Sequence, residues 1–138
     1  MAKLIPVAPL AKLKRGKPLC VEHRGVPYCV VKTKDGEVRS FVTVCTHKDL
    51  AMFPPDAQNG KLICPFHEAT FDAATGKLAK SSRRKAKRLQ KVDVEIIKGV
   101  IHIEAKKKHR KLLPKSERKW VVKEGRKLRK KQNKKQKG

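Results

Sequence analysis

Two short segments of this 138-residue chain place cysteine and histidine at the spacing of metal ligands. Cys45-Thr46-His47 and Cys64-Pro65-Phe66-His67 form the patterns C-x-H and C-x-x-H, with sixteen residues between them. Two thiolates and two imidazoles from neighbouring loops can hold a tetrahedral zinc ion or a two-iron cluster with mixed ligands. The spacing by itself leaves both kinds of metal centre open.

The other cysteines and histidines lie outside this pattern. If Arg24-Gly25 forms a two-residue turn, Cys20 lies directly across from Cys29, either as two reduced thiols or as a cross-strand disulfide. We favour reduced thiols, because half-buried cysteines pack as small apolar side chains. We expect the remaining histidines to be structural or solvated, namely His23, His102 and His109.

The segments that must position the ligands have the pattern of an all-β domain. Residues 18–104 alternate short β-branched runs with turn residues and show little helical periodicity. Asp-Gly and similar pairs predict hairpin turns at Asp35-Gly36, Lys98-Gly99, Asn59-Gly60 and Thr75-Gly76. Lys61–Cys64 and Thr70–Ala73 are expected to be short strands, within a total of roughly seven to nine.

The Lys98-Gly99 turn also predicts a strand register. A two-residue loop would pair Ile97 with Val100, because the residues that flank such a loop face each other. The same register pairs Val94 with Ile103 and Ile96 with Ile101 on one face, and Glu95 with His102 on the other.

The ligand pattern and the residues that follow it resemble the Rieske family of [2Fe–2S] proteins. The resemblance covers about residues 2–105, and Phe71-Asp72 with Thr75-Gly76 extend it beyond what a simple zinc module would contain. It implies one [2Fe–2S] cluster per chain, with Cys45 and Cys64 on one iron and His47 and His67 on the other. It also implies layered antiparallel β-sheets with a small cluster-binding subdomain, whose loops fall at about residues 45–53 and 64–72.

Within that family the chain looks like a soluble ferredoxin. High-potential members carry a loop disulfide and hydroxyl groups that bond the sulfurs, whereas the corresponding positions here look like Leu50, Phe66, Ala69 and Phe71. We therefore expect a reduction potential toward the lower part of the Rieske range of roughly −150 to +300 mV. The resemblance implies a one-electron carrier that serves an oxygenase or another redox partner, with a reductase as donor.

The sequence departs from the family at two places. Asp49 and Glu68 stand where glycine is common, and the third loop, at residues 78–90, is basic instead of apolar and proline-bearing. We expect this basic loop to attract acidic partner proteins toward the cluster.

Charge divides the chain into a body and a tail. Lys and Arg total 37 against 12 Asp and Glu, a net charge of +25, of which residues 1–105 carry +10 and residues 106–138 carry +15. So few apolar residues in the second segment predict a disordered or transiently helical tail, with Trp120 able to pin it to the body. Its lysines suit non-specific contact with nucleic acid or another anionic surface.

Length and composition argue against several functions and leave one alternative open. No apolar run approaches the roughly 18 residues of a membrane span, so we expect a cytoplasmic protein. A complete Rieske oxygenase needs a second iron site, for which the tail offers only His109, so the chain is not expected to be an enzyme on its own. The alternative function is a nucleic-acid-associated binding module with a zinc-stabilised or redox-sensing Cys2His2 site.

Overall fold

The computed structural model describes residues 3–14, 17–33, 35–45, 50–52, 56–58, 60–64, 69–79 and 88–137. These residues form twelve strands, more than the seven to nine expected, because several are only two or three residues long and leave no sequence pattern. In chain order the elements are β1 (Lys3–Pro9), η1 (Leu10–Lys12), β2 (Leu19–His23), β3 (Val26–Lys32), β4 (Val38–Val42), β5 (Val44–Cys45), β6 (Leu50–Ala51), β7 (Asp56–Gln58), β8 (Lys61–Ile63), β9 (Thr70–Asp72), β10 (Gln90–Val92), β11 (Val94–Ile97), β12 (Val100–Ala105), η2 (Lys107–Leu112) and α1 (Lys115–Lys137).

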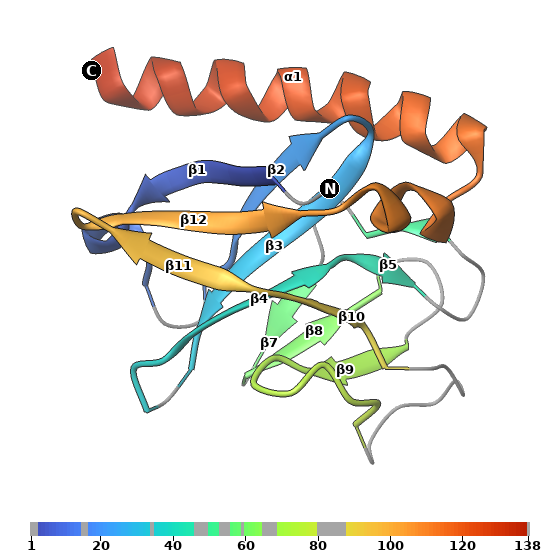
Figure 1. The fold of residues 1–138 in the computed structure, drawn as a ribbon, viewed down its shortest axis with the longest axis horizontal. Helices are drawn as coiled ribbons and strands as arrows, with labels where there is room; N and C mark the ends of the chain where they lie inside the picture. The colour runs from blue at the N-terminus through green and yellow to red at the C-terminus, as the bar shows by residue number, and fades with distance from the viewer. Residues whose placement is uncertain are drawn as a thin grey trace.

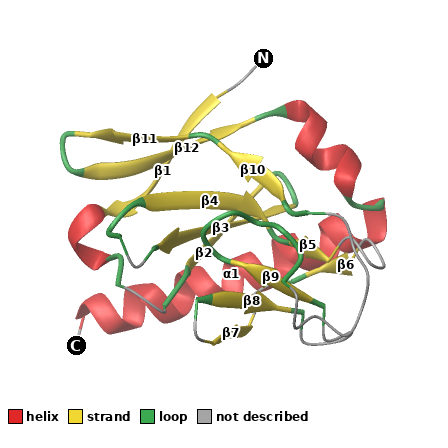
Figure 2. Ribbon diagram, turned by 90° about the horizontal axis from the view of Figure 1, so that it is seen from below, coloured by secondary structure: helices red, strands yellow, loops and turns green. Residues whose placement is uncertain are grey.

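The strands form four antiparallel sheets, which confirms the expected all-β class. The two larger sheets have the orders β1-β12-β11 and β10-β4-β3-β2, and the two smaller ones are β5-β6 and β7-β8-β9. Figure 2 shows the three-stranded sheet β1-β12-β11, the four-stranded sheet and the β7–β9 sheet as successive layers. The small sheets carry both ligand segments, so the expected cluster-binding subdomain corresponds to β5–β9.

The register predicted from Lys98-Gly99 is confirmed. Ile97 pairs with Val100, and all three further predicted pairs are present, including Glu95 with His102. Lys98 and Gly99 have φ values of +50° and +77°, as a primed two-residue turn requires. Because Ile101 and Ile103 are buried while Ile96 and Ile97 stay exposed, only β12 faces the core fully at this edge.

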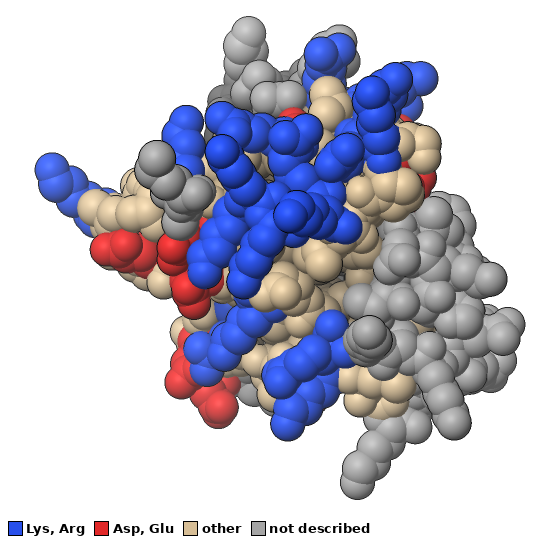
Figure 3. Space-filling model, turned by 45° about the vertical axis from the view of Figure 1, so that its right-hand side comes forward, with Lys and Arg blue, Asp and Glu red and all other residues tan. Residues whose placement is uncertain are grey.

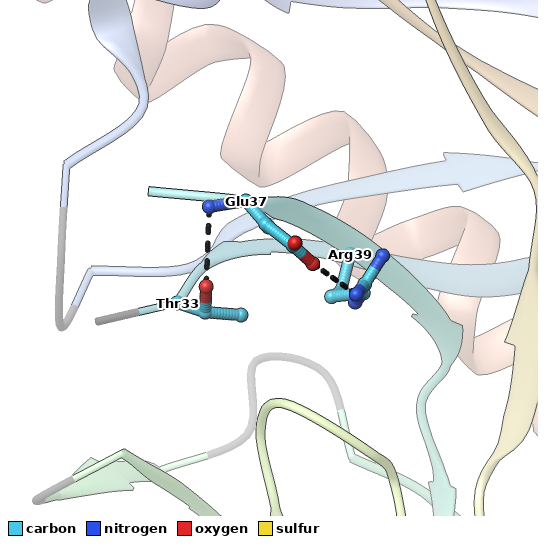
Figure 4. A network of polar contacts seen from close by, with 3 residues as sticks. All are labelled: Thr33, Glu37 and Arg39. Atoms are coloured by element: carbon cyan, nitrogen blue, oxygen red, sulfur yellow. Dashed lines mark hydrogen bonds and ion pairs between the residues drawn. The ribbon is translucent and has the colours of Figure 1, made fainter. Parts of the chain in front are cut away.

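The hairpin predicted at Asp35-Gly36 is also present, between β3 and β4. The Thr33 N–H donates to the Glu37 carbonyl at 2.9 Å, so the loop holds three residues and ends at Gly36, whose φ is +82°. Figure 4 shows how side chains close this turn: the Thr33 hydroxyl accepts from the Glu37 N–H at 3.1 Å, and Glu37 pairs with Arg39.

Cys20 and Cys29 lie opposite each other, as the Arg24-Gly25 turn predicts. The β2–β3 register pairs the two residues, and both thiols are free, so the cross-strand disulfide is absent. A hydrogen bond between the Cys29 and Cys20 thiols and burial raise the pKa of the Cys29 thiol well above its ordinary value. Both cysteines are buried and belong to the apolar core.

The N-terminal strand β1 has no counterpart in the sequence expectations. It pairs with β12 at one edge of its sheet, and the register shifts between Pro6 and Ala8. A proline lacks an N–H donor and is tolerated at an edge strand or at such an irregularity, which explains how a proline-containing segment can join the sheet.

Residues 107–137, expected to be disordered or transiently helical, form η2 and α1 in the structure. Leu113 and Val121 are buried in the same core as the sheets, and Trp120 and Leu128 pack against it. The spacing of Val121 and Leu128 places them on one side of α1, so a sparse apolar stripe suffices to dock the helix. Figure 1 shows α1 running along the outside of the sheet, beside β2 and β3.

Two glycines allow α1 to lie close to the β2–β3 hairpin. A Cβ atom at Gly125 would lie 2.7 Å from the Cβ of Glu22, and one at Gly25 would lie 2.7 Å from the Cβ of Arg118. Any larger side chain at either position would push the helix away from the hairpin.

Buried hydrogen bonds fix η2 against the sheet. The Tyr28 hydroxyl and the Lys106 N–H both approach Nδ1 of His109, at 2.9 and 3.2 Å. A backbone N–H can only donate, so Nδ1 is the acceptor and the neutral His109 ring carries its proton on Nε2. His109 is thus structural, as one of the two sequence-based alternatives proposed.

Candidate metal centre

The first ligand segment begins at the end of β5. Cys45 is the last residue of this strand and pairs with Leu50, the first residue of β6, while Val44 pairs with Ala51. Residues 46–49 connect the two strands and contain His47, which lies outside the described residues. The backbone therefore places Cys45 at the base of a four-residue loop.

The second ligand segment begins directly after β8. The Cys64 N–H donates to the Ala69 carbonyl at 2.9 Å, and the Cys64 side chain is 1% exposed. Residues 65–68 connect these two positions and contain His67, which is also outside the described residues. Cys64 is therefore at the base of a second loop of the same length.

The two loops share one local design. Each starts with a predicted thiolate ligand and is closed by backbone pairing, of Cys45 with Leu50 and of Cys64 with Ala69. Figures 1 and 2 show β5 in the same part of the molecule as β8 and β9, and Figure 2 shows β6 next to β5. Paired strands with four-residue connections can hold two ligands each on rigid supports.

The residues after the second loop anchor it to the core. Phe71 is buried and pairs with Leu62, while the Asp72 carboxylate and carbonyl accept from the N–H groups of Ala74 and Gly76 at 2.8 and 2.7 Å. Gly76 has a φ of +76°, and a Cβ there would lie 2.7 Å from the ring of Phe41. The residues Phe71-Asp72 and Thr75-Gly76, which extend the sequence motif, thus lead into a turn that packs against the buried Phe41.

Most of the basic third loop, residues 80–87, lies outside the described residues. Backbone contacts hold its two ends: Leu78 forms a bridge with Phe71, and the buried Leu89 donates its N–H to the Gly76 carbonyl at 2.8 Å. The loop consequently leaves and returns beside the turn that anchors the second ligand segment.

The positions that lack sulfur-bonding groups are partly described. Ala69 and Phe71 are buried and offer no hydroxyl, and Leu50 belongs to β6. Phe66 and the two residues that replace glycine, Asp49 and Glu68, lie outside the described residues.

A carboxylate from α1 supports the first loop, a role that the sequence expectations missed. The Ala51 N–H, at the end of the β5–β6 pair, donates to Oε1 of Glu117 at 3.1 Å. Glu117 is 66 residues away in the chain, and no local motif links it to the metal pattern. Only the docking of α1 on the sheet brings the two residues together.

Two of the four proposed cluster donors begin their loops within the described part of the chain. The buried Cys64 thiol begins one loop, and Cys45, held by strand pairing, begins the other. Among the described side chains no group of three or more Cys, His, Asp or Glu could hold a metal ion, since both proposed histidine ligands and the Cys45 side chain lie outside that set. No helix in the described ranges is long and apolar enough to cross a membrane.

Comparison with known proteins points to one family. The model of the Rieske [2Fe-2S] domain matches residues 3–98. The alpha subunit of 2-aminobenzenesulfonate 2,3-dioxygenase from an Alcaligenes species is 33% identical over 61 residues, which are 44% of this chain but only 16% of that subunit. This chain thus corresponds to a small part of that curated relative.

Solved structures agree on the fold. The Sphingomonas yanoikuyae B1 ferredoxin is 25% identical and superposes with a TM-score of 0.62, over 75% of this chain and 100% of that one. The ferredoxin of carbazole 1,9a-dioxygenase from Nocardioides aromaticivorans IC177 is 24% identical with a TM-score of 0.61, over 75% of this chain and 99% of that one. The quarter of the chain that these alignments leave uncovered matches in length the segment after β12.

Proposed function

The chain belongs to the Rieske [2Fe–2S] domain family, and from this we propose that it is a ferredoxin-like component that delivers single electrons to an oxygenase. A Rieske domain carries one [2Fe–2S] cluster, so this protein is a Rieske-type electron carrier. When bound, the cluster supplies a one-electron redox couple, and the chain supplies the ligands and the docking surface.

Similarity to whole ferredoxins supports the ferredoxin role. The chain aligns with 100% of the Sphingomonas yanoikuyae B1 ferredoxin and 99% of the Nocardioides aromaticivorans ferredoxin. A carrier needs only a cluster near a surface that binds a reductase and an acceptor in turn. Both partners, a reductase as electron donor and an oxygenase as electron acceptor, are part of the proposal.

The ligands proposed for the cluster are Cys45 and Cys64 on one iron and His47 and His67 on the other. The observation that carries this assignment is the pair of four-residue loops closed at Cys45–Leu50 and Cys64–Ala69, on adjacent sheets. We also propose a cytoplasmic location, which the free Cys20 and Cys29 thiols favour because such a close pair would oxidise in a secreted protein.

Metal analysis and spectroscopy of anaerobically reconstituted protein test the cluster assignment. We expect two irons and two acid-labile sulfides per chain, and an EPR signal on reduction. His47→Cys should keep the cluster but lower its potential, because an added thiolate makes the centre more negative, and His67→Cys should do the same. His102→Cys, on β12, is the control and should change nothing. A colourless protein with one zinc would establish the alternative binding module instead.

Turnover tests the role as an oxygenase component. The protein should restore electron flow from a flavin reductase to a Rieske oxygenase in a mixture that lacks its ferredoxin, and Cys64→Ser should not. Reconstituted protein that holds its cluster, accepts electrons and yet supports no oxygenase from a panel of such systems would contradict this role while leaving the cluster assignment intact.

A further inference from the structure

A cavity of about 240 Å³ lies where three separate parts of the chain meet. Its walls come from the start of β1, from the β2–β3 turn and strand β3, and from the end of β12 with η2. The lining residues are Lys3, His23, Arg24, Val26, Tyr28, Ala105, Lys106, Lys107 and Arg110. Since both larger sheets and η2 contribute, the cavity is a product of the whole fold.

Five of the lining side chains are cationic and none is acidic. Within the described part of the chain, no ion pair involves Lys3, Arg24, Lys106, Lys107 or Arg110. Figure 3 shows Lys and Arg side chains crowded on the face that contains η2 and the start of α1, with most visible carboxylates toward its edges. The cavity therefore concentrates positive charge, and no acidic side chain is among the residues that line it.

The base of the cavity is apolar. Val26, Tyr28 and Ala105 are buried, and the Tyr28 hydroxyl is already bonded to Nδ1 of His109 at 2.9 Å. Since Val26 and Tyr28 are each 1% exposed, a ligand would meet mainly the aliphatic parts of the Lys and Arg side chains that line the cavity. Such a combination suits an anion that carries a compact apolar group.

The pKa of one histidine that lines the cavity reflects the nearby positive charge. Burial, followed by the charges of Arg24 and Lys3, lowers the pKa of His23 despite the nearby Glu22. Burial is the largest cause of this shift, and the charges of Arg24 and Lys3 add to it.

We propose that this cavity binds a small organic phosphate monoester, with the phosphate between Arg24, Lys107 and Arg110 and the organic group against the aliphatic parts of the lining Lys and Arg side chains. Two guanidinium groups match phosphate oxygens geometrically, and a dianion offsets more of the five cationic charges than a carboxylate would. Inorganic phosphate would leave those aliphatic parts without a contact. A long polyanion would extend beyond a cavity of this volume.

Calorimetric titration of the cluster-containing full chain with phenyl phosphate tests the proposal. We expect one saturable site, with binding at least about tenfold tighter than that of inorganic phosphate or benzoate. Arg24→Gln with Lys107→Gln should weaken phenyl phosphate binding at least about tenfold, since it removes two charge-assisted contacts. Lys12→Gln with Lys91→Gln removes two exposed lysines elsewhere and is the matched control.

Histidine NMR signals give the location independently of affinity. Phenyl phosphate should shift the ring signals of His23, which lines the cavity, and leave those of His102 unchanged. Lys107→Gln alone, at an exposed side chain that folding does not need, should already reduce the His23 shift at a fixed ligand concentration.

Four results would overturn the proposal. They are no saturable binding up to about 1 mM, equal losses in both double variants, equal affinity for inorganic phosphate, and unchanged His23 signals. A glutamate-rich peptide that binds more tightly than phenyl phosphate and depends on the same residues would identify the cavity as a protein-docking site instead.

Discussion

The carboxylate of Glu117 on α1 accepts a hydrogen bond from the backbone N–H of Ala51, which ends the hairpin that carries Cys45. The bond is 3.1 Å long and part-buried. It connects the C-terminal helix directly to the first ligand loop, so a segment expected to be a tail contributes to the support of the proposed cluster site.

Removing the Glu117 carboxylate should destabilise the first ligand loop more than the rest of the protein. Glu117→Ala leaves the Ala51 N–H without its acceptor, and we expect a loss of about 1–2 kcal/mol in the free energy of unfolding. The [2Fe–2S] absorbance should also decay faster under mild denaturant. Glu117→Gln keeps an oxygen acceptor, so its free energy of unfolding should lie between those of the unaltered protein and of Glu117→Ala. Glu124→Ala removes only an exposed pairing with Lys127 and is the control.

Two truncations separate the docked part of the C-terminal segment from the rest. Deleting residues 129–138 removes six lysines and arginines but none of the residues known to be buried, so stability should hold while salt-dependent partner binding weakens. Deleting residues 106–138 also removes Leu113 and Val121, and should cost about 3–6 kcal/mol. Urea unfolding curves measure both. Equal stability of the two truncated proteins would show that α1 is dispensable.

Stability should fall in acid partly through His109. Burial, followed by Lys108 and Lys106, lowers the pKa of His109 to about 4, below the ordinary 6.5 that it regains on unfolding. The unfolded chain therefore binds the proton more readily, so this contribution is complete above pH 6.5 and is lost as pH falls toward 4. Lys108→Gln should raise the His109 pKa measured by NMR. His109→Gln should flatten the unfolding free energy between pH 6.5 and 4, and an unchanged slope would contradict this account.

The reduction potential should lie toward the lower part of the roughly −150 to +300 mV Rieske range, because Ala69 and Phe71 offer no hydroxyl. The Ala69 carbonyl accepts a hydrogen bond from the Cys64 N–H, so a hydroxyl on residue 69 would lie close to the second loop. Ala69→Ser should raise the potential measured by protein-film voltammetry. Ala105→Ser, at a buried alanine of β12, should leave it unchanged. A lower potential in Ala69→Ser would remove this explanation.

Local signals in the sequence predicted the hairpins well. The Lys98-Gly99 and Arg24-Gly25 turns fix strand registers through their own backbone geometry, so Ile97 opposite Val100 and Cys20 opposite Cys29 follow from a few residues. The turn at Asp35-Gly36 is also where it was predicted, and Thr33 and Glu37 close it with backbone and side-chain hydrogen bonds.

Long-range packing was the part that sequence patterns missed. α1 carries few apolar residues, and its charge content by itself predicts disorder. Val121 and Leu113 become buried only because β2 and β3 present a surface for them, and Glu117 meets Ala51 only in the docked state. The ligand pattern itself stays a prediction at His47 and His67, which lie outside the described residues.

The opposed contacts Gly125–Glu22 and Gly25–Arg118 have a consequence for how α1 can sit on the hairpin. A slide by one residue would move the helix about 1.5 Å and rotate it by about 100°, which would bring a full side chain into the space that Gly125 leaves. The helix therefore has a single docking register, and the Glu117 carboxylate reaches Ala51 in that register alone. A one-residue insertion between residues 117 and 125 would misalign the glycine and the carboxylate, although it would alter neither the composition of the core nor a proposed ligand.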